Sequence, residues 1–219
     1  MNKTIGLLFG SFNPVHIGHL TLANYFLAFS ELDEVRFVVS PHNPLKDTEL
    51  LLPADERLKM TMLAVENFPA VSVSDEEFYL PKPSYTVDTL KFFSQKYPDN
   101  EFILIIGEDN LEIFDKWKDY QYILDHYKIY VYNRPDAAPS PFSQHPNVRF
   151  FQAPLLDISS TFIRQAIQDG KDVRHFLPEK VYEYIERQGR ANASKFPMKC
   201  TLFLPYSKNN KTTSYVTRV

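Results

Sequence analysis

The chain has 219 residues, of which 44% are hydrophobic and 15% aromatic, and this predicts one domain with a substantial buried core. A net charge of −3 argues against nucleic-acid binding through bulk charge, and the single cysteine excludes an internal disulfide framework. The sequence has no signal-peptide pattern and no long apolar span, so we expect a cytoplasmic protein with neither a nucleic-acid nor a membrane partner.

The first strand and the turn after it carry the clearest signal. An apolar run from Ile5 to Phe9 predicts a short buried strand, which breaks at Gly10. A Ser-Phe-Asn-Pro turn at 11–14 then leads to His16 and His19, at the start of a helix-periodic segment. Such a junction presents backbone N–H groups and the positive end of a helix dipole to an anion, so we predict a phosphate site here.

The spacing of the two histidines places them on the same side of the first helical turn. Both imidazoles can therefore reach one anionic group, and Gly18 between them has no Cβ to obstruct a phosphate. Neither histidine has a Cys, Asp or Glu nearby at metal-ligand spacing, so a zinc site is not expected. The alternative is a pair of ordinary polar residues at a helix start.

Strands and helices then alternate, which predicts a parallel sheet with right-handed crossovers, in an α/β, Rossmann-like, doubly wound fold. The predicted elements are strands at 34–39 and 71–74, and a helix from about Asp55 with Leu58, Met62 and Val65 along one face. A Pro-rich loop at 41–46 separates the first of these strands from the helix.

In the middle of the chain, a helix opens within Pro83–Leu90, with Ser84 or Thr86 as its cap. The run from Phe102 to Ile106 is the most apolar strand, as expected for a central parallel strand, and it ends in a sharp turn at 107–110. Further strands are predicted at 129–132 and 148–151, with a Pro-rich surface loop at 135–146 between them.

A second anion site is predicted near residue 160. Ser159 can cap a helix whose first turn offers the hydroxyls of Ser160 and Thr161, and Arg164 lies one turn later on the same face. A planar guanidinium suits a phosphate, although a well-capped helix with a solvated arginine would give the same pattern. Because a parallel sheet places all such junctions along one edge, one polyphosphate could touch both sites.

The end of the chain differs in composition. A last helix is predicted from about Pro178 to Gln188, ending at Gly189. Residues 191–219 contain basic residues and no acidic ones, so we expect a domain at 1–190 followed by a basic extension without a catalytic role. The alternative use of the extension is contact within a homo-oligomer.

Four blocks, in order and at similar spacing, resemble the bacterial nicotinate-nucleotide adenylyltransferases of the HIGH-type nucleotidyltransferase superfamily. The blocks are Gly10–His19, Pro83–Leu90, Gly107–Asp109 followed by Trp117, and Ile158–Arg164. The resemblance covers about residues 3–190 and implies an enzyme of NAD biosynthesis. Its partners would be ATP and nicotinate mononucleotide, its products deamido-NAD and pyrophosphate, and its cofactor Mg²⁺. The chain has no GxxxxGK[ST] loop, which excludes a P-loop kinase or ATPase by motif.

The same resemblance implies the site residues. Three would be catalytic: His16, His19 and Arg164. The ATP site would comprise Gly10, Ser11, Phe12, His16, His19, Gly107, Asp109, Ile158, Ser159, Ser160 and Arg164. The mononucleotide site would comprise Asn13, Lys46, Ser84, Tyr85, Thr86 and Trp117, and no residue is assigned to a metal.

Two departures from the family pattern leave the acceptor open. The turn Gly10–Pro14 reads Gly-Ser-Phe-Asn-Pro, which looks more like enzymes that also accept the nicotinamide nucleotide. The family's Pro-Pro-His-Lys loop is here Asn43–Lys46, so only the lysine carries over. The alternatives are a dual-specificity enzyme, another HIGH-type adenylyltransferase such as one acting on pantetheine phosphate, or a module that binds ATP without turnover.

Overall fold

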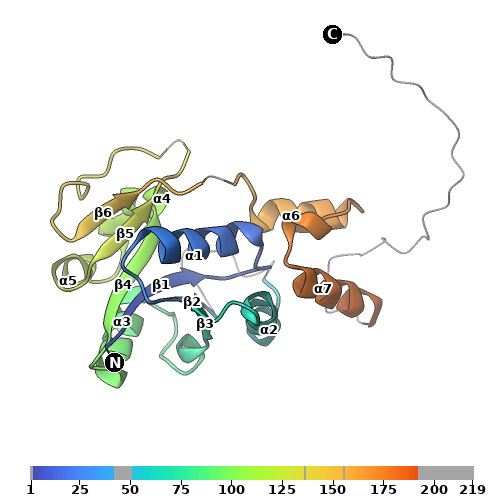
Figure 1. Ribbon diagram of the computed structural model, residues 1–219, viewed down its shortest axis with the longest axis horizontal. Helices are drawn as coiled ribbons and strands as arrows, with labels where there is room; N and C mark the ends of the chain where they lie inside the picture. Colours follow the sequence, from blue (N-terminus) through green and yellow to red (C-terminus); the bar gives the residue numbers. More distant parts are fainter. Residues whose placement is uncertain (1, 42–50, 136, 155, 192–219) are drawn as a thin grey trace, which may run out of the picture.

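A computed structural model describes residues 2–41, 51–135, 137–154 and 156–191. Within them, six parallel strands form one sheet in the order β3-β2-β1-β4-β5-β6 (Figure 1). The strands are β1 (Thr4–Gly10), β2 (Glu34–Val39), β3 (Val71–Ser74), β4 (Glu101–Gly107), β5 (Ile129–Tyr132) and β6 (Val148–Phe151). This order is that of a doubly wound, Rossmann-like sheet, so the predicted fold class is confirmed.

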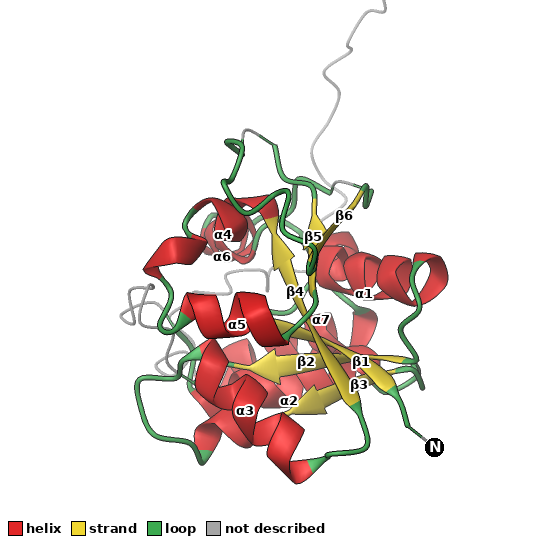
Figure 2. Cartoon of the chain, turned by 90° about the vertical axis from the view of Figure 1, so that its left-hand side faces the viewer, coloured by secondary structure: helices red, strands yellow, loops and turns green. Residues whose placement is uncertain are grey.

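Helices cover both faces of this sheet. They are α1 (Ile17–Phe29), α2 (Ala54–Val65), α3 (Thr86–Lys96), α4 (Glu108–Glu112), α5 (Tyr120–His126), α6 (Ser160–Gln168) and α7 (Glu179–Ala191). Three single-turn helices, η1 (Glu76–Phe78), η2 (Phe114–Lys116) and η3 (Arg174–Phe176), lie in the connections. In Figure 2, α3 and α5 lie on one side of the strands and α1 on the other, and in Figure 1 α6 and α7 lie together at one end of the molecule.

The two faces of the sheet carry separate hydrophobic cores, because successive side chains of a strand point to opposite sides. On β4, Ile103 and Ile105 pack in the core that includes Phe26 of α1. Leu104 and Ile106 pack in the other core, with Phe93 of α3. A strand buried on both faces needs an unbroken apolar run, and this explains why β4 stood out in the sequence.

The strand order reverses between β1 and β4, and this reversal positions the site. The chain proceeds outward from β1 through β2 and β3, then returns to the other side of β1 as β4. In sheets of this kind a crevice opens beyond the carboxyl ends of the strands at the reversal. Gly10 and Gly107, the last residues of these two strands, lie at that edge.

Three local predictions were wrong. On α2, Met62 is 48% exposed, and the buried residues include Met60 and Arg57. Val65 is buried and Leu58 packs against the core, as predicted, so of the three residues only Met62 was placed wrongly. A helical period cannot identify a buried arginine, so Arg57 was missed. The N-cap of α3 is Tyr85, whose side chain makes no capping bond, and neither Ser84 nor Thr86 fills that role. Gly189 lies inside α7, which continues to residue 191.

Some of the sequence predictions concern residues that the structure does not describe. Lys46 and residues 192–219 lie outside the described residues. No helix in the described ranges has the length and apolar character needed to span a membrane.

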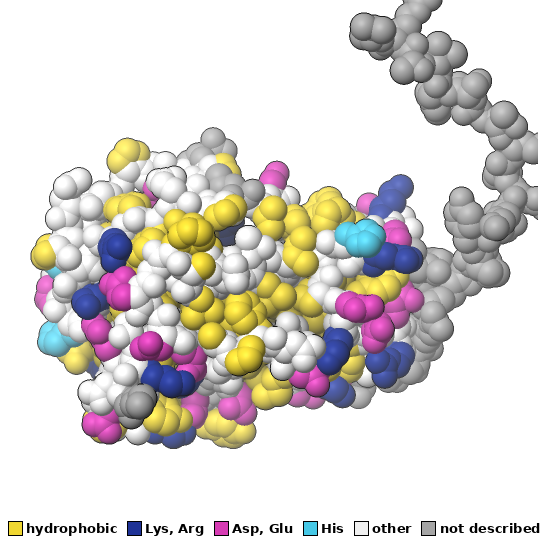
Figure 3. Space-filling model, in the orientation of Figure 1, with side chains coloured by type: hydrophobic (Ala, Val, Ile, Leu, Met, Phe, Trp, Pro, Cys, Tyr) yellow, Lys and Arg dark blue, Asp and Glu magenta, His cyan; other side chains and the backbone are white. Residues whose placement is uncertain are grey.

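On the face shown in Figure 3, hydrophobic side chains gather over the middle, and charged side chains concentrate toward its two ends.

Candidate active site

A cavity of about 700 Å³ opens at the carboxyl edge of the sheet. The junction after β1 contributes Gly10, Ser11, Phe12, Asn13, His16 and His19, and the start of α6 contributes Ile158, Ser159, Ser160 and Arg164. The start of α3 contributes Ser84, Tyr85 and Thr86, and the region after β4 contributes Gly107, Asp109 and Trp117. The structure thus brings together every site residue named from the sequence except Lys46. The volume is in the range of pockets that enclose a nucleotide-sized ligand.

The two histidines form a fixed pair at the start of α1. The backbone N–H of His16, the N-cap residue, donates to Nδ1 of His19 at 3.1 Å, and the two ring centroids are 3.7 Å apart. Since Nδ1 of His19 accepts this bond, its proton resides on Nε2. The ring can therefore donate from Nε2 to an anion.

His16 is neutral at physiological pH. Only 6% of the residue is exposed, and Nδ1 has no hydrogen-bond partner within the described chain. Burial, with a smaller contribution from the positive charge of Arg134, lowers its pKa from 6.5 to about 4. A Cβ on Gly18 would lie 3.0 Å from this Nδ1, so the glycine leaves room for the ring.

The start of α6 packs directly on the loop after β1. Ser160 Oγ donates to the carbonyl of Pro14 at 2.9 Å, and Arg164 Nη1 donates to the carbonyl of Asn13 at 2.9 Å. Ser159 caps the helix as predicted, accepting from the N–H of Phe162 at 3.1 Å. Burial lowers the pKa of Arg164, but a guanidinium stays protonated at neutral pH. The same cavity is therefore lined by the Arg164 guanidinium and by the N-terminal ends of α1 and α6.

Phe12 has an unusual backbone conformation, with φ of 45°. A side chain in this left-handed region costs roughly 1–2 kcal/mol. The ring is buried, stacks on Phe37 at 5.1 Å between centroids, and meets the edge of His19 at the same distance. Burying a phenylalanine contributes about 1.5–3 kcal/mol, enough to hold the turn in this conformation.

The opposite wall, beyond β4 and β5, carries a basic residue that the sequence analysis missed. Arg134 Nε lies 3.7 Å from Asp109 Oδ1, and its backbone N–H donates to Glu108 at 2.8 Å. A Cβ on Gly107 would lie 2.3 Å from Asp109 Oδ1 and 3.2 Å from the Arg134 side chain. The sequence did offer a signal for Arg134, because it follows the predicted strand 129–132 and must therefore lie at the same edge of the sheet.

The far end of the cavity is aromatic and polar. Ser84 Oγ and Trp117 Nε1 are buried and have no partner among the described residues. Lys118 Nζ donates to Asp88 at 2.8 Å and lies 4.7 Å from the centroid of the Tyr85 ring. The first N–H groups of α3 also open here, which gives this end a positive character.

Glu77, on η1, lines the same cavity and was not predicted. Its Oε1 accepts from Thr89 Oγ1 at 2.8 Å, and its Oε2 has no partner in the described part of the chain. Burial raises the pKa of this carboxyl group, against the opposing effect of hydrogen bonds from Thr89 and Ser40. Across the described ranges, no three His, Cys, Asp or Glu side chains are grouped so as to hold a metal ion.

Comparison with known proteins identifies relatives of this chain. The cytidylyltransferase-like family model matches residues 7–166. A protein of Flavobacterium johnsoniae is 48% identical over 83% of this chain and 95% of its own length, and one of Cytophaga hutchinsonii is 51% identical over 83% and 94%. Both are named probable nicotinate-nucleotide adenylyltransferase.

A solved structure shares the fold at much lower sequence identity. Plasmodium falciparum nicotinic acid mononucleotide adenylyltransferase, complexed with NaAD, superposes with a TM-score of 0.72 at 18% identity. The match covers 89% of this chain and 98% of that one. With the family model matching more than half of the chain and relatives near 50% identity, the chain belongs to the nicotinate-nucleotide adenylyltransferases, within the cytidylyltransferase-like family.

Proposed function

We propose that this cavity binds ATP and nicotinate mononucleotide side by side and transfers the adenylyl group between them. The products are deamido-NAD and pyrophosphate. One observation carries the proposal: the histidine pair, the start of α6 and the aromatic end with Trp117 all line a single cavity. A phosphate-binding region and a ring-binding region are therefore within reach of one pair of substrates.

The phosphates of ATP lie, in this proposal, between the starts of α1 and α6. His19 donates from Nε2, Arg164 supplies the fixed positive charge, and the first N–H groups of both helices complete the site. His16, being neutral, acts as a hydrogen-bond donor. The unpartnered Ser11 Oγ, buried at the same place, is available to an oxygen of the nucleotide.

The nicotinate ring lies at the aromatic end. The N–H groups at the start of α3 suit its carboxylate, and the face of Trp117 suits a cationic pyridine ring. Lys118 adds a positive charge beside Tyr85. The adenosine of ATP takes the other wall, near Gly107 and Asp109.

The chemistry is a direct in-line displacement. A phosphate oxygen of the mononucleotide attacks the α-phosphorus of ATP, and the bond from that phosphorus to the bridging oxygen breaks. Pyrophosphate leaves with the electron pair. The attacking phosphate is already anionic, so no general base is needed, and the protein contributes positioning and stabilisation of charge on the leaving group.

Magnesium enters this proposal with ATP, as part of the nucleotide chelate. This hard cation prefers oxygen ligands, keeps several waters and is commonly held through substrate phosphates. Oxygen-bearing side chains that line the cavity include Ser11, Glu77 and Asp109. When bound, the cation neutralises negative charge on the phosphates.

The test is the ratio of kcat/KM for nicotinate and nicotinamide mononucleotides, measured by pyrophosphate release with ATP and Mg²⁺. We expect the nicotinate compound to be the better acceptor. Equal values would identify a dual-specificity enzyme, and turnover only with pantetheine phosphate would identify a different adenylyltransferase. Tight ATP binding without pyrophosphate release for any acceptor would contradict an enzymatic function.

A further inference from the structure

Arg57, on α2, is a buried arginine that the mechanism above does not use. Only 1% of the residue is exposed, and its guanidinium donates four hydrogen bonds to backbone carbonyls of described residues. Nε donates to Leu52 at 3.0 Å, Nη1 to Ser11 at 2.6 Å and to Ser40 at 2.9 Å, and Nη2 to Pro41 at 3.1 Å. Three chain segments therefore meet at one side chain.

The charge of Arg57 is not neutralised by a salt bridge with any described residue. Burial lowers its pKa to about 10, so the group is still protonated at neutral pH. Removing a charge from water without an ion-pair partner is costly, and such an arrangement persists where the structure fully satisfies the group by other bonds. The carbonyl partners accept from the guanidinium in four hydrogen bonds, which compensate for much of the water that it loses.

The bond to Ser11 fixes the direction of one peptide in the nucleotide-binding loop. The carbonyl of Ser11 points toward Arg57, which is not part of the cavity wall, whereas Ser11 and Phe12 both line the cavity. In a planar trans peptide the N–H points opposite to the C=O. The N–H of Phe12 is therefore directed to the cavity side. Phe12 is also the residue with φ of 45°, and the Arg57 bond holds this peptide in place together with the burial of the Phe12 ring.

Three other carbonyls of this loop also accept hydrogen bonds. The carbonyl of Gly10 accepts from the N–H of Ser40 at 2.9 Å, and those of Asn13 and Pro14 accept from Arg164 and Ser160. A carbonyl oxygen facing a phosphate would repel it, whereas an N–H group attracts it. The Ser11 carbonyl, which accepts from Arg57, follows the same pattern: each of these oxygens accepts a hydrogen bond from the protein.

We propose that Arg57 is a positioning residue for adenylyl transfer. It holds the Ser11 carbonyl away from the nucleotide so that the Phe12 N–H faces the phosphates, and it adds a buried positive charge behind the loop. This inference rests on the proposed function, because it assigns the phosphates of ATP to this loop.

The experiment compares Arg57→Met with Met60→Ala. Methionine keeps most of the length of the side chain but cannot donate, and Met60 is a fully buried neighbour on α2 that lies outside the cavity wall. At matched folded fraction, we expect Arg57→Met to lose about 10²-fold in kcat/KM for ATP. The Met60→Ala control should stay within about threefold of wild type even if its melting temperature falls equally. Equal kinetic losses in the two variants would overturn the proposal.

Two further measurements keep the test decisive. If Arg57→Met does not fold, Arg57→Lys is used: one ammonium group cannot reach all four carbonyls, so we expect at least a tenfold loss in kcat/KM, and a wild-type value would overturn the proposal. Calorimetric affinity for a non-hydrolysable ATP analogue gives a readout independent of turnover. Weaker binding of the analogue by Arg57→Met supports the inference even if no mononucleotide is turned over. Absence of turnover would contradict only the proposed acceptor, whereas unchanged binding of the analogue would contradict the role of Arg57.

Discussion

His16 provides the sharpest quantitative prediction, because burial lowers its pKa from 6.5 to about 4. In the unfolded chain this imidazole takes up a proton as the pH falls below about 6.5, whereas in the folded protein it does so only near pH 4. The unfolded state therefore binds more protons in this window, and stability falls as the pH falls from about 6.5 to about 4. The full lowering corresponds to a loss of about 3 kcal/mol.

The measurement is the free energy of unfolding by denaturant between pH 4 and pH 8, for wild type and for His16→Gln. The wild-type curve should fall on acidification by up to about 3 kcal/mol more than that of the variant. Glu77, with its raised pKa, contributes with the opposite sign in an overlapping window, but it is present in both proteins and cancels in the difference. Parallel curves for the two proteins would refute the reasoning.

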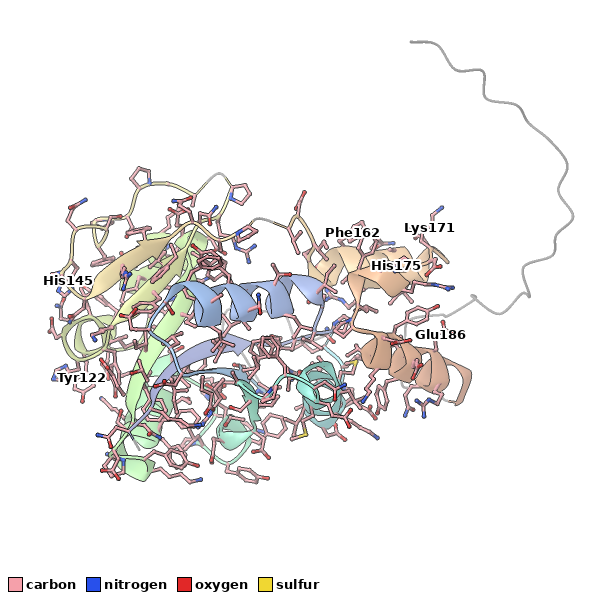
Figure 4. All side chains as sticks on the ribbon, viewed as in Figure 1. Tyr122, His145, Phe162, Lys171, His175 and Glu186 are labelled. Atoms are coloured by element: carbon pink, nitrogen blue, oxygen red, sulfur yellow. The ribbon has the colours of Figure 1, made fainter. Side chains whose placement is uncertain are left out.

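The control is His175→Gln, which removes an exposed histidine at the end of the molecule formed by η3 and α6 (Figure 4). Its curve should follow that of wild type. A second measurement uses the ligand: phosphates placed beside His16 favour its protonated form, so ATP binding near pH 6 should take up protons. Calorimetry in buffers of different ionisation enthalpy detects this uptake, and its absence would separate His16 from the phosphate site.

Three substitutions test other parts of the cavity by steady-state kinetics. His19→Ala should fold normally but lose about 10²-fold or more in kcat, and near wild-type turnover would remove its role. Trp117→Leu should raise KM for the mononucleotide several-fold while leaving KM for ATP unchanged. The reverse pattern would mean that ATP, and not the mononucleotide, binds at the Trp117 end of the cavity. Gly107→Ala places a methyl group too close to Asp109 Oδ1, so the Asp109 side chain must shift and KM for ATP should rise with little loss of melting temperature. An unchanged KM for ATP would mean that ATP does not contact the wall at Gly107.

The fold was predictable because its elements are marked by local patterns. β1 and β4 each have an apolar run in the middle, since both of their faces are buried there, and α6 begins at a serine whose capping bond forms within one turn. The convergence of the site followed from a general property of parallel sheets: each strand-to-helix junction lies at one edge. The residues from Gly10 to Arg164 could thus be brought together without knowledge of their contacts.

The features that were missed depend on tertiary contacts. From the sequence, an arginine such as Arg57 on α2 is expected to face solvent. Its burial is possible because four backbone carbonyls accept its hydrogen bonds, most of them from segments distant in sequence. The neutral state of His16 likewise depends on how the cavity closes around the ring. Lys118 pairs with Asp88, which is thirty residues earlier on α3, and no sequence period links the two.

The bonds from Ser160 and Arg164 to the loop after β1 have a consequence for synthesis of the chain. These contacts join residues about 150 positions apart, so the N-terminal half can form its strands before the donors have been made. Contacts of such separation form late in folding because closing a long loop is entropically costly. A ribosome-bound chain that ends before α6 therefore carries both histidines but lacks the guanidinium opposite them, and it becomes competent to hold a triphosphate only after α6 has been made.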